Sequence, residues 1–176
     1  AGVATAIADK LDSIVGFFGM NIQPTGSQDP YALRRQALGI VHTVLGHNLT
    51  LSLKKLVTES YRLLREQVDF PNSQEKTWDD IQAFFQQRMD NVLAESGIRY
   101  DVINAVLAGE IDNLWVIKEK AFAISDFRES AKFRQLIAGF TRTANLAKNA
   151  VHSNVNEELF TEPEEGRLHQ EFIKIR

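Results

Sequence analysis

The sequence predicts an all-α protein built from two packed helical units. Apolar residues recur at spacings of three and four along most of the chain, and no stretch shows the strict alternation of a half-buried strand. Glycine and proline gather where these periodic stretches end. With 176 residues, 44% of them hydrophobic, the chain is long enough for one medium or two small domains with a real core.

The first predicted helix loosens at Gly16 and Gly19. Phe17 lies off its apolar face, so we expect Phe17 to face a neighbouring domain. The apolar face itself is one stripe at helical spacing, made of Ile7, Leu11, Ile14, Val15 and Phe18.

Residues 24–45 begin as a turn and become a helix. Asp29 is the predicted N-cap and Pro30 the predicted first helical residue; Gly46 is the predicted residue just beyond the end. Arg34 and Arg35 fall near the positive end of the helix dipole, where cations are mildly disfavoured. We therefore expect this pair to have a fixed anionic partner, either a carboxylate across a helix or domain interface, which we favour, or a phosphate.

The next helix is predicted to be capped by Thr50 or Ser52. It is followed at residues 69–77 by DFPNSQEKT, a polar stretch whose Pro71 and Asn72 break any helix. This stretch is the predicted domain boundary. Thr77 is the predicted cap of the helix after it.

Beyond the boundary the longest periodic stretch runs from residue 133 to 151. Its apolar side is predicted to be buried, and a last helix is predicted to begin with Pro163 as its first residue. The other side of the long stretch is polar and mostly cationic, with Arg134, Arg142, Asn145 and Lys148.

Several kinds of chemistry are not supported by the sequence. Zero cysteines exclude disulfides and thiolate sites, and no apolar run is long enough to span a membrane. The four histidines lack metal-ligand spacing, and no glycine-rich phosphate loop or nucleophile elbow is present. A net charge of -3 argues against a surface that grips nucleic acid everywhere, though not against a local basic stripe. We expect no autonomous enzyme and no metal.

The cationic stripe supports two interpretations. Lysine and arginine can neutralise phosphates, and asparagine and arginine can read bases; a solvated helix face is the alternative, and periodicity alone favours it. Arg88 has the same ambiguity.

Two contiguous motifs carry a resemblance to a known family. ADKLDSIVGFFG and PTGSQDPYALRRQALGI are similar to the late part of the β subunit of bacterial glycyl-tRNA synthetases. FFQQRMDNVLAESGIRYDVINAVLAG and GFTRTANLAKNA resemble later family segments, the last one keeping Arg142 and Asn145 but carrying Thr141 where the family usually has lysine.

The resemblance implies an architecture and a function. Residues 1–68 would be the closing helices of an HD-like domain, and residues 75–176 an incomplete anticodon-binding helical domain of the kind found in arginyl-tRNA synthetases. The chain opens inside a helical pattern and closes without a cap, so we expect a fragment truncated at its C-terminus. The family's enzyme is a cytoplasmic α₂β₂ assembly that charges tRNA-Gly, with ATP, Mg and glycine activation on the α subunit. The cationic stripe and the resemblance together predict RNA-binding residues Arg134, Arg142, Asn145, Lys148 and Arg88, and the resemblance implies no catalytic residue in this chain.

Two other function classes stay open. One is a structural or subunit-assembly module without RNA contact, which the acidic net charge and Phe17 favour. The other is a residual hydrolase, suggested only by the relation to HD domains.

Overall fold

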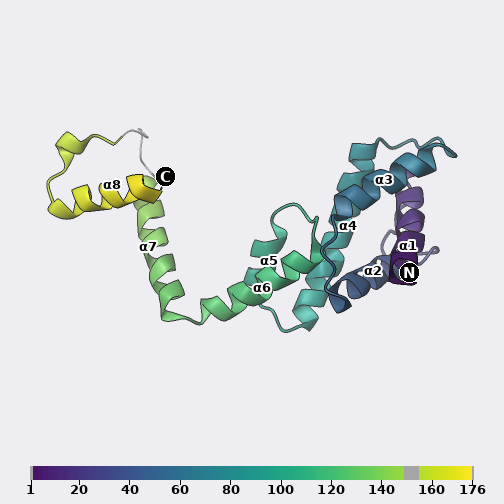
Figure 1. Cartoon of the computed structure of the whole chain (residues 1–176), viewed down its shortest axis with the longest axis horizontal. Helices are drawn as coiled ribbons and strands as arrows, with labels where there is room; N and C mark the ends of the chain where they lie inside the picture. The colour runs from purple at the N-terminus through teal and green to yellow at the C-terminus, as the bar shows by residue number, and fades with distance from the viewer. Residues whose placement is uncertain (1, 149–154, 176) are drawn as a thin grey trace. The chain divides into compact units, whose positions relative to one another are not determined.

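The computed structural model describes residues 2–148 and 155–175, and in these ranges helices joined by loops make up the chain (Figure 1). The predicted all-α fold is confirmed: in the described ranges the single β-type pairing is an isolated bridge between Thr25 and Gln28. The chain forms two compact units, Ala1–Ser130 and Ala131–Arg176. The elements are α1 (Gly2–Gly19), α2 (Leu33–Gly46), α3 (Leu53–Arg65), α4 (Gln74–Glu95), α5 (Tyr100–Leu107), α6 (Leu114–Arg128), α7 (Ala131–Ala147), a 3₁₀ turn η1 (Glu157–Leu159) and α8 (Pro163–Ile175).

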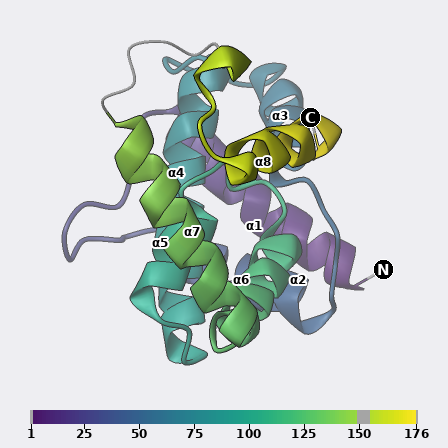
Figure 2. The same cartoon turned by 90° about the vertical axis from the view of Figure 1, so that its left-hand side faces the viewer.

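The first unit is organised around α4, which contacts each of the other five helices in it. Its apolar side chains Ile81, Phe85, Met89 and Leu93 are fully buried. One continuous hydrophobic cluster runs from α1 to α6, and α5 and α6 lie side by side in both views (Figures 1 and 2). The core therefore spans both sides of residues 69–77, where the sequence predicts a domain boundary. The division into an HD-like part and an anticodon-binding part stays a prediction.

The start of α2 differs from the prediction. Asp29 does cap the helix, accepting hydrogen bonds from the backbone amides of Leu33 (2.8 Å) and Arg34 (2.9 Å). The helix begins at Leu33 and not at Pro30, because residues 29–32 close a separate turn in which the Ala32 amide donates to the Asp29 carbonyl. Ala32 then adopts φ 54°, which breaks the helical run before it can include the turn.

The end of α2 is also shifted. Gly46 is the last helical residue, and Asn48, with φ 53°, is the residue that turns the chain. The amide of Leu49 then donates to the carbonyl of Val44, which satisfies one of the free carbonyls at the helix end. Asparagine tolerates this left-handed conformation because its short polar side chain bonds locally.

The predicted cap of α3 is confirmed and that of α4 is wrong. Ser52 accepts from the amide of Lys55 at 3.2 Å. At α4 the cap is Ser73, which accepts from the amide of Lys76 at 3.2 Å. The helix thus begins one turn earlier than predicted, and Thr77 becomes a fully buried residue inside it.

The loop between α3 and α4 is tied to the end of α1. Asn72 donates from its side chain to the carbonyl of Phe18 (2.9 Å) and from its amide to the carbonyl of Gly19 (3.2 Å). Its own carbonyl accepts from the hydroxyl of Tyr61 at 2.7 Å. The predicted boundary segment is therefore held firmly against the first helix.

Phe17 has a partner inside the unit. Its ring stacks on that of Tyr31 with the centroids 4.0 Å apart. We expected Phe17 to face a neighbouring domain, but the loop before α2 covers one face of its ring.

The second unit differs from the first in the burial of its apolar side chains. No residue of α7 is buried, and the apolar face that the sequence predicts to be buried is exposed: Leu136, Ile137 and Phe140 are 60%, 45% and 70% exposed. Val151, the predicted last member of that face, lies outside the described residues. The predicted start of α8 at Pro163 is confirmed.

Candidate nucleic-acid interface

The polar stripe of α7 consists of four exposed side chains, those of Arg134, Arg142, Asn145 and Lys148, the last lying just after the helix. Their spacing of eight, eleven and fourteen residues from Arg134 returns them to one side of a helix with 3.6 residues per turn. Within the residues that the structure describes, none of the four makes an ion pair within 4.0 Å. The stripe is therefore free to meet a ligand.

The charge of α7 sets it apart from the rest of the chain. The helix carries Lys132, Arg134 and Arg142 and has no aspartate or glutamate, whereas the whole chain has a formal net charge of -3. Exposed cations without competing carboxylates attract phosphates, and the amide of Asn145 can add hydrogen bonds to base edges. This is the chemistry of a local basic stripe on an acidic protein.

Arg88 belongs to the first unit, on α4, where the residue is only 8% exposed. Its Nη1 donates to the carbonyl of Phe84 (2.7 Å) and to Oε1 of Gln87 (3.1 Å), and its Cζ lies 3.7 Å from the centroid of the Phe84 ring. Burial, and then the charge of Arg34, lower the pKa of Arg88, while Asp29 opposes that shift. A sequence signal for this burial exists: Arg88 falls four residues after Phe84, on the apolar face of α4.

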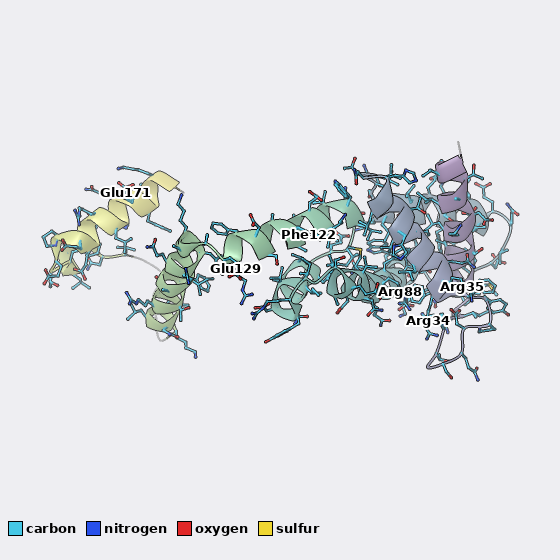
Figure 3. The ribbon with its side chains drawn as sticks, turned by 90° about the horizontal axis from the view of Figure 1, so that it is seen from below. Arg34, Arg35, Arg88, Phe122, Glu129 and Glu171 are labelled. Atoms are coloured by element: carbon cyan, nitrogen blue, oxygen red, sulfur yellow. The ribbon has the colours of Figure 1, made fainter. Side chains whose placement is uncertain are left out.

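Arg34 and Arg35 lie at the start of α2, and Figure 3 labels them together with Arg88. Arg34 donates from Nη2 to the carbonyl of Gly26 (2.9 Å) and from Nη1 to that of Gln28 (3.5 Å). Arg35 is exposed. Among the described residues no carboxylate lies within 4.0 Å of either guanidinium, so the anionic partner expected for the pair is not found there.

The structure thus groups the predicted residues in two places. One group is the stripe of α7 in the second unit. The other is the arginine group Arg34, Arg35 and Arg88 in the first unit.

Sequence reasoning missed a third feature, on α6. Lys118 Nζ lies 4.8 Å from the ring centroid of Trp115 and 5.9 Å from that of Phe122, which is 41% exposed. The spacing i, i+3 and i+7 was the available signal, because it places all three side chains on one face. Such aromatic–cationic faces can stack unpaired bases.

The described residues offer neither a metal site nor a membrane span. No group of three or more histidine, cysteine, aspartate or glutamate side chains there is arranged to hold a metal ion. No described helix is long and apolar enough to cross a membrane.

Comparison with known proteins identifies the family. A family model described as glycyl-tRNA synthetase beta subunit matches residues 1–108. Proteins named glycine–tRNA ligase beta subunit match most of the chain: that of Desulforamulus reducens is 43% identical over 89% of it, that of Clostridioides difficile 39% over 100%, and that of Syntrophus aciditrophicus 38% over 99%.

The chain spans about a quarter of the length of these relatives, 23% of the first and 25% of the other two. The family model matches more than half of the chain, and the resemblance of its motifs points the same way. The chain belongs to the glycyl-tRNA synthetase beta subunit family.

Proposed function

We propose that this chain is a tRNA-binding part of the β subunit of a glycine–tRNA ligase, and that the α7 stripe contacts the RNA. The observation that carries the proposal is the free cationic stripe itself, on a helix without acidic residues in a chain of this family. Arg134, Arg142 and Lys148 would neutralise phosphates and orient the RNA, and Asn145 would read a base.

The proposal extends to the anticodon of tRNA-Gly. Sequence-specific RNA recognition mostly targets unpaired bases, which can be splayed out and hydrogen-bonded on their edges. An anticodon loop offers such bases beside closely spaced phosphates. The combination of arginine, lysine and asparagine on one helix face suits that target better than it suits a uniform duplex.

The division of labour in the enzyme follows from the family. ATP, Mg and the activation of glycine would belong to the α subunit of a cytoplasmic α₂β₂ assembly. This chain would supply binding and orientation of the RNA and no catalytic residue. Arg88 was also predicted as an RNA contact; it is buried in the first unit, so we do not count it with the α7 stripe.

The test uses the assembled enzyme with Arg142→Ala in the β subunit. We expect weaker binding of tRNA-Gly, and a dependence of the binding constant on salt that is shallower by about 0.7–0.9 per lost phosphate contact. Lys132→Ala is the matched control, because it removes the same charge from the same helix but lies off the stripe. Asn145→Ala should reduce the preference for the native anticodon over an altered one.

The same experiment can contradict the proposal. If Arg142→Ala leaves tRNA affinity and charging unchanged, or if Lys132→Ala weakens binding equally, the stripe does not bind the RNA. An unchanged anticodon preference in Asn145→Ala would confine the stripe to contacts with the backbone.

A second candidate function is subunit assembly, and two observations favour it. The apolar face of α7, with Leu136, Ile137 and Phe140, is exposed. In the first unit an apolar groove of about 310 Å³ is open beside Phe17 and Phe70. If Phe140→Ser prevents the α and β subunits from purifying together while Arg142→Ala has no effect on tRNA, assembly is the better description of this chain.

A further inference from the structure

The proposed function leaves the arginine group of the first unit unexplained. Arg88 places a permanent positive charge in a site that is 8% exposed. The two acceptors that its guanidinium reaches, the Phe84 carbonyl and the Gln87 side-chain oxygen, are both neutral. Burying a cation without an anion is costly, so the arrangement calls for a negatively charged partner.

The guanidinium group of Arg88 uses only some of its hydrogen-bond donors within the described residues. Both of these hydrogen bonds come from Nη1, which leaves Nε and Nη2 without a partner among the described residues. Neither atom is fully buried. Among the described residues, the fully buried side-chain nitrogen or oxygen atom without a hydrogen bond is Thr77 Oγ1, and no atom of Arg88 is in that class. One edge of the guanidinium therefore remains open, and an oxyanion binds arginine through such an edge.

Arg34 brings a second guanidinium to this contact, because it lies at the start of α2, and α2 packs on α4, which carries Arg88. It lies close enough for its charge to lower the pKa of Arg88, and it is held by the backbone of the preceding loop, through the carbonyls of Gly26 and Gln28. Figure 3 shows the two side chains coming from different helices, α2 and α4. Two like charges held near each other from separate elements repel, unless an anion lies between them.

The nearby carboxylate does not fill this role. Asp29 uses both carboxylate oxygens to accept from the amides of Leu33 and Arg34, and it makes no ion pair within 4.0 Å among the described residues. Arg34 and Arg88 carry two positive charges, against the one carboxylate of Asp29 that acts on Arg88, on a chain whose formal net charge is -3.

We propose that Arg34 and Arg88 together bind one phosphate group at the α2–α4 contact. A phosphate monoester carries about -1.5 to -2 charges, which balances the two guanidinium groups, and its tetrahedral oxygens can meet guanidinium groups that approach from different helices. A single carboxylate carries one charge and has two coplanar oxygens, so it fits the pair less well. The proposal rests on the first unit alone and is independent of the role proposed for α7.

The experiment is equilibrium dialysis of labelled inorganic phosphate against the full-length β subunit, at an ionic strength held constant with chloride. We expect saturable binding. Arg34→Ala and Arg88→Lys should each weaken it roughly tenfold or more, as expected for the loss of a charge-assisted hydrogen bond. Arg88→Lys keeps the charge and the aliphatic stem but removes the fork. Arg65→Ala, an exposed arginine of the same unit, should have no effect.

Two further arms identify the phosphate source and exclude the carboxylate. Displacement of the labelled phosphate by tRNA would identify an RNA phosphate as the ligand, and its persistence under saturating tRNA would identify a free phosphate compound; either result supports the site. The proposal is overturned if binding is not saturable, if Arg34→Ala binds as well as the unaltered protein, or if acetate competes as well as phosphate does. Circular dichroism of each variant confirms that loss of binding is not loss of fold.

Discussion

The hydroxyl of Ser52 donates a 2.8 Å hydrogen bond to the carboxylate of Asp112, joining residues 60 positions apart in the sequence. The same carboxylate oxygen accepts from the backbone amide of Lys54 at 2.9 Å, and the Asp112 carbonyl accepts from the amide of Leu53. Asp112 therefore caps α3 from the loop before α6. This contact connects the part of the chain before residue 68 to the part after residue 75.

Replacing Asp112 by alanine should lower the free energy of unfolding by about 1–2 kcal/mol, because the first turn of α3 loses a cap and Ser52 loses its acceptor. Urea unfolding followed by circular dichroism measures the change. Glu110→Ala is the control: its 2.7 Å ion pair with Lys54 is about half exposed on both sides and should contribute about 0–1 kcal/mol. An equal cost for the two variants would show that the Asp112 contacts do not stabilise α3 as a cap.

The close approach of Gly19 to Phe70 gives a second prediction. A Cβ atom at Gly19 would lie 2.9 Å from the Phe70 ring, a distance at which the ring or the loop must move. Gly19→Ala should therefore destabilise the chain by about 1–3 kcal/mol. Gly46→Ala is its counterpart, since a Cβ there meets nothing within 4 Å. That variant should be neutral or stabilise by a few tenths of a kcal/mol up to about 1 kcal/mol, so thermal unfolding should separate the two in opposite directions.

Much of the first unit can be predicted from the sequence because its helices are amphipathic with a clear period. The stripe Ile7, Leu11, Ile14 is buried as predicted, since a helix must turn its apolar face toward the core to remove that surface from water. The same logic holds for Ile81 and Phe85 on α4. For these helices periodicity indicates which face is buried, even though it does not indicate which helix covers that face.

The helix boundaries were harder to predict, for a physical reason. Alanine gives no sign that it will adopt a left-handed conformation, which costs roughly 1–2 kcal/mol for a residue with a Cβ. Ala32 does so because the Asp29 carboxylate and the turn before it supply several hydrogen bonds that offset the strain. Such compensation depends on atoms brought together by the fold, and a pattern of residue types does not contain it.

The two candidate sites also differ in how far the sequence could predict them. The stripe of α7 could be predicted because its residues share one side of one helix, whereas the opposite, apolar side, predicted to be buried from the same period, is exposed. The pairing of Arg34 with Arg88 could not be predicted, since it depends on how α2 packs on α4. For Arg88 the sequence left RNA contact and a solvated helix face open, although its place on the apolar face of α4 pointed to burial.

Thr77 gives a prediction in the stabilising direction. Its hydroxyl is fully buried and has no hydrogen-bond partner among the described residues. Thr77→Val removes that unsatisfied group at nearly constant volume, so we expect the free energy of unfolding to rise by about 1 kcal/mol. Thr77→Ser keeps the hydroxyl and loses a buried methyl group, and should destabilise by about 1 kcal/mol. A destabilised valine variant would mean that the hydroxyl has a partner in solution, such as an ordered water.

The start of α8 should depend on pH through Glu165. Its carboxylate oxygen Oε2 accepts from the backbone amides of Thr161 (2.7 Å) and Glu162 (3.0 Å), and these two bonds hold the pKa of Glu165 below its ordinary value. A carboxyl whose pKa is lowered by folding stabilises the folded form above the pKa of the unfolded chain. That stabilisation is lost as the pH falls through the lower, folded value.

We therefore expect the amides of Thr161 and Glu162 to lose their protection from hydrogen exchange as the pH falls below about 4.3, the ordinary value for glutamate, once the known pH dependence of intrinsic exchange is removed. In Glu165→Gln these two amides should be less protected than in the unaltered chain already at neutral pH, because a neutral amide oxygen accepts more weakly than a carboxylate. Glu164→Gln is the control: its carboxylate lies 3.5 Å from Arg167 on the exposed surface and accepts no backbone hydrogen bond among the described residues. If Glu164→Gln reproduces the loss of protection, general attraction between the helix dipole and acidic residues explains the effect, and the two specific hydrogen bonds of Glu165 do not.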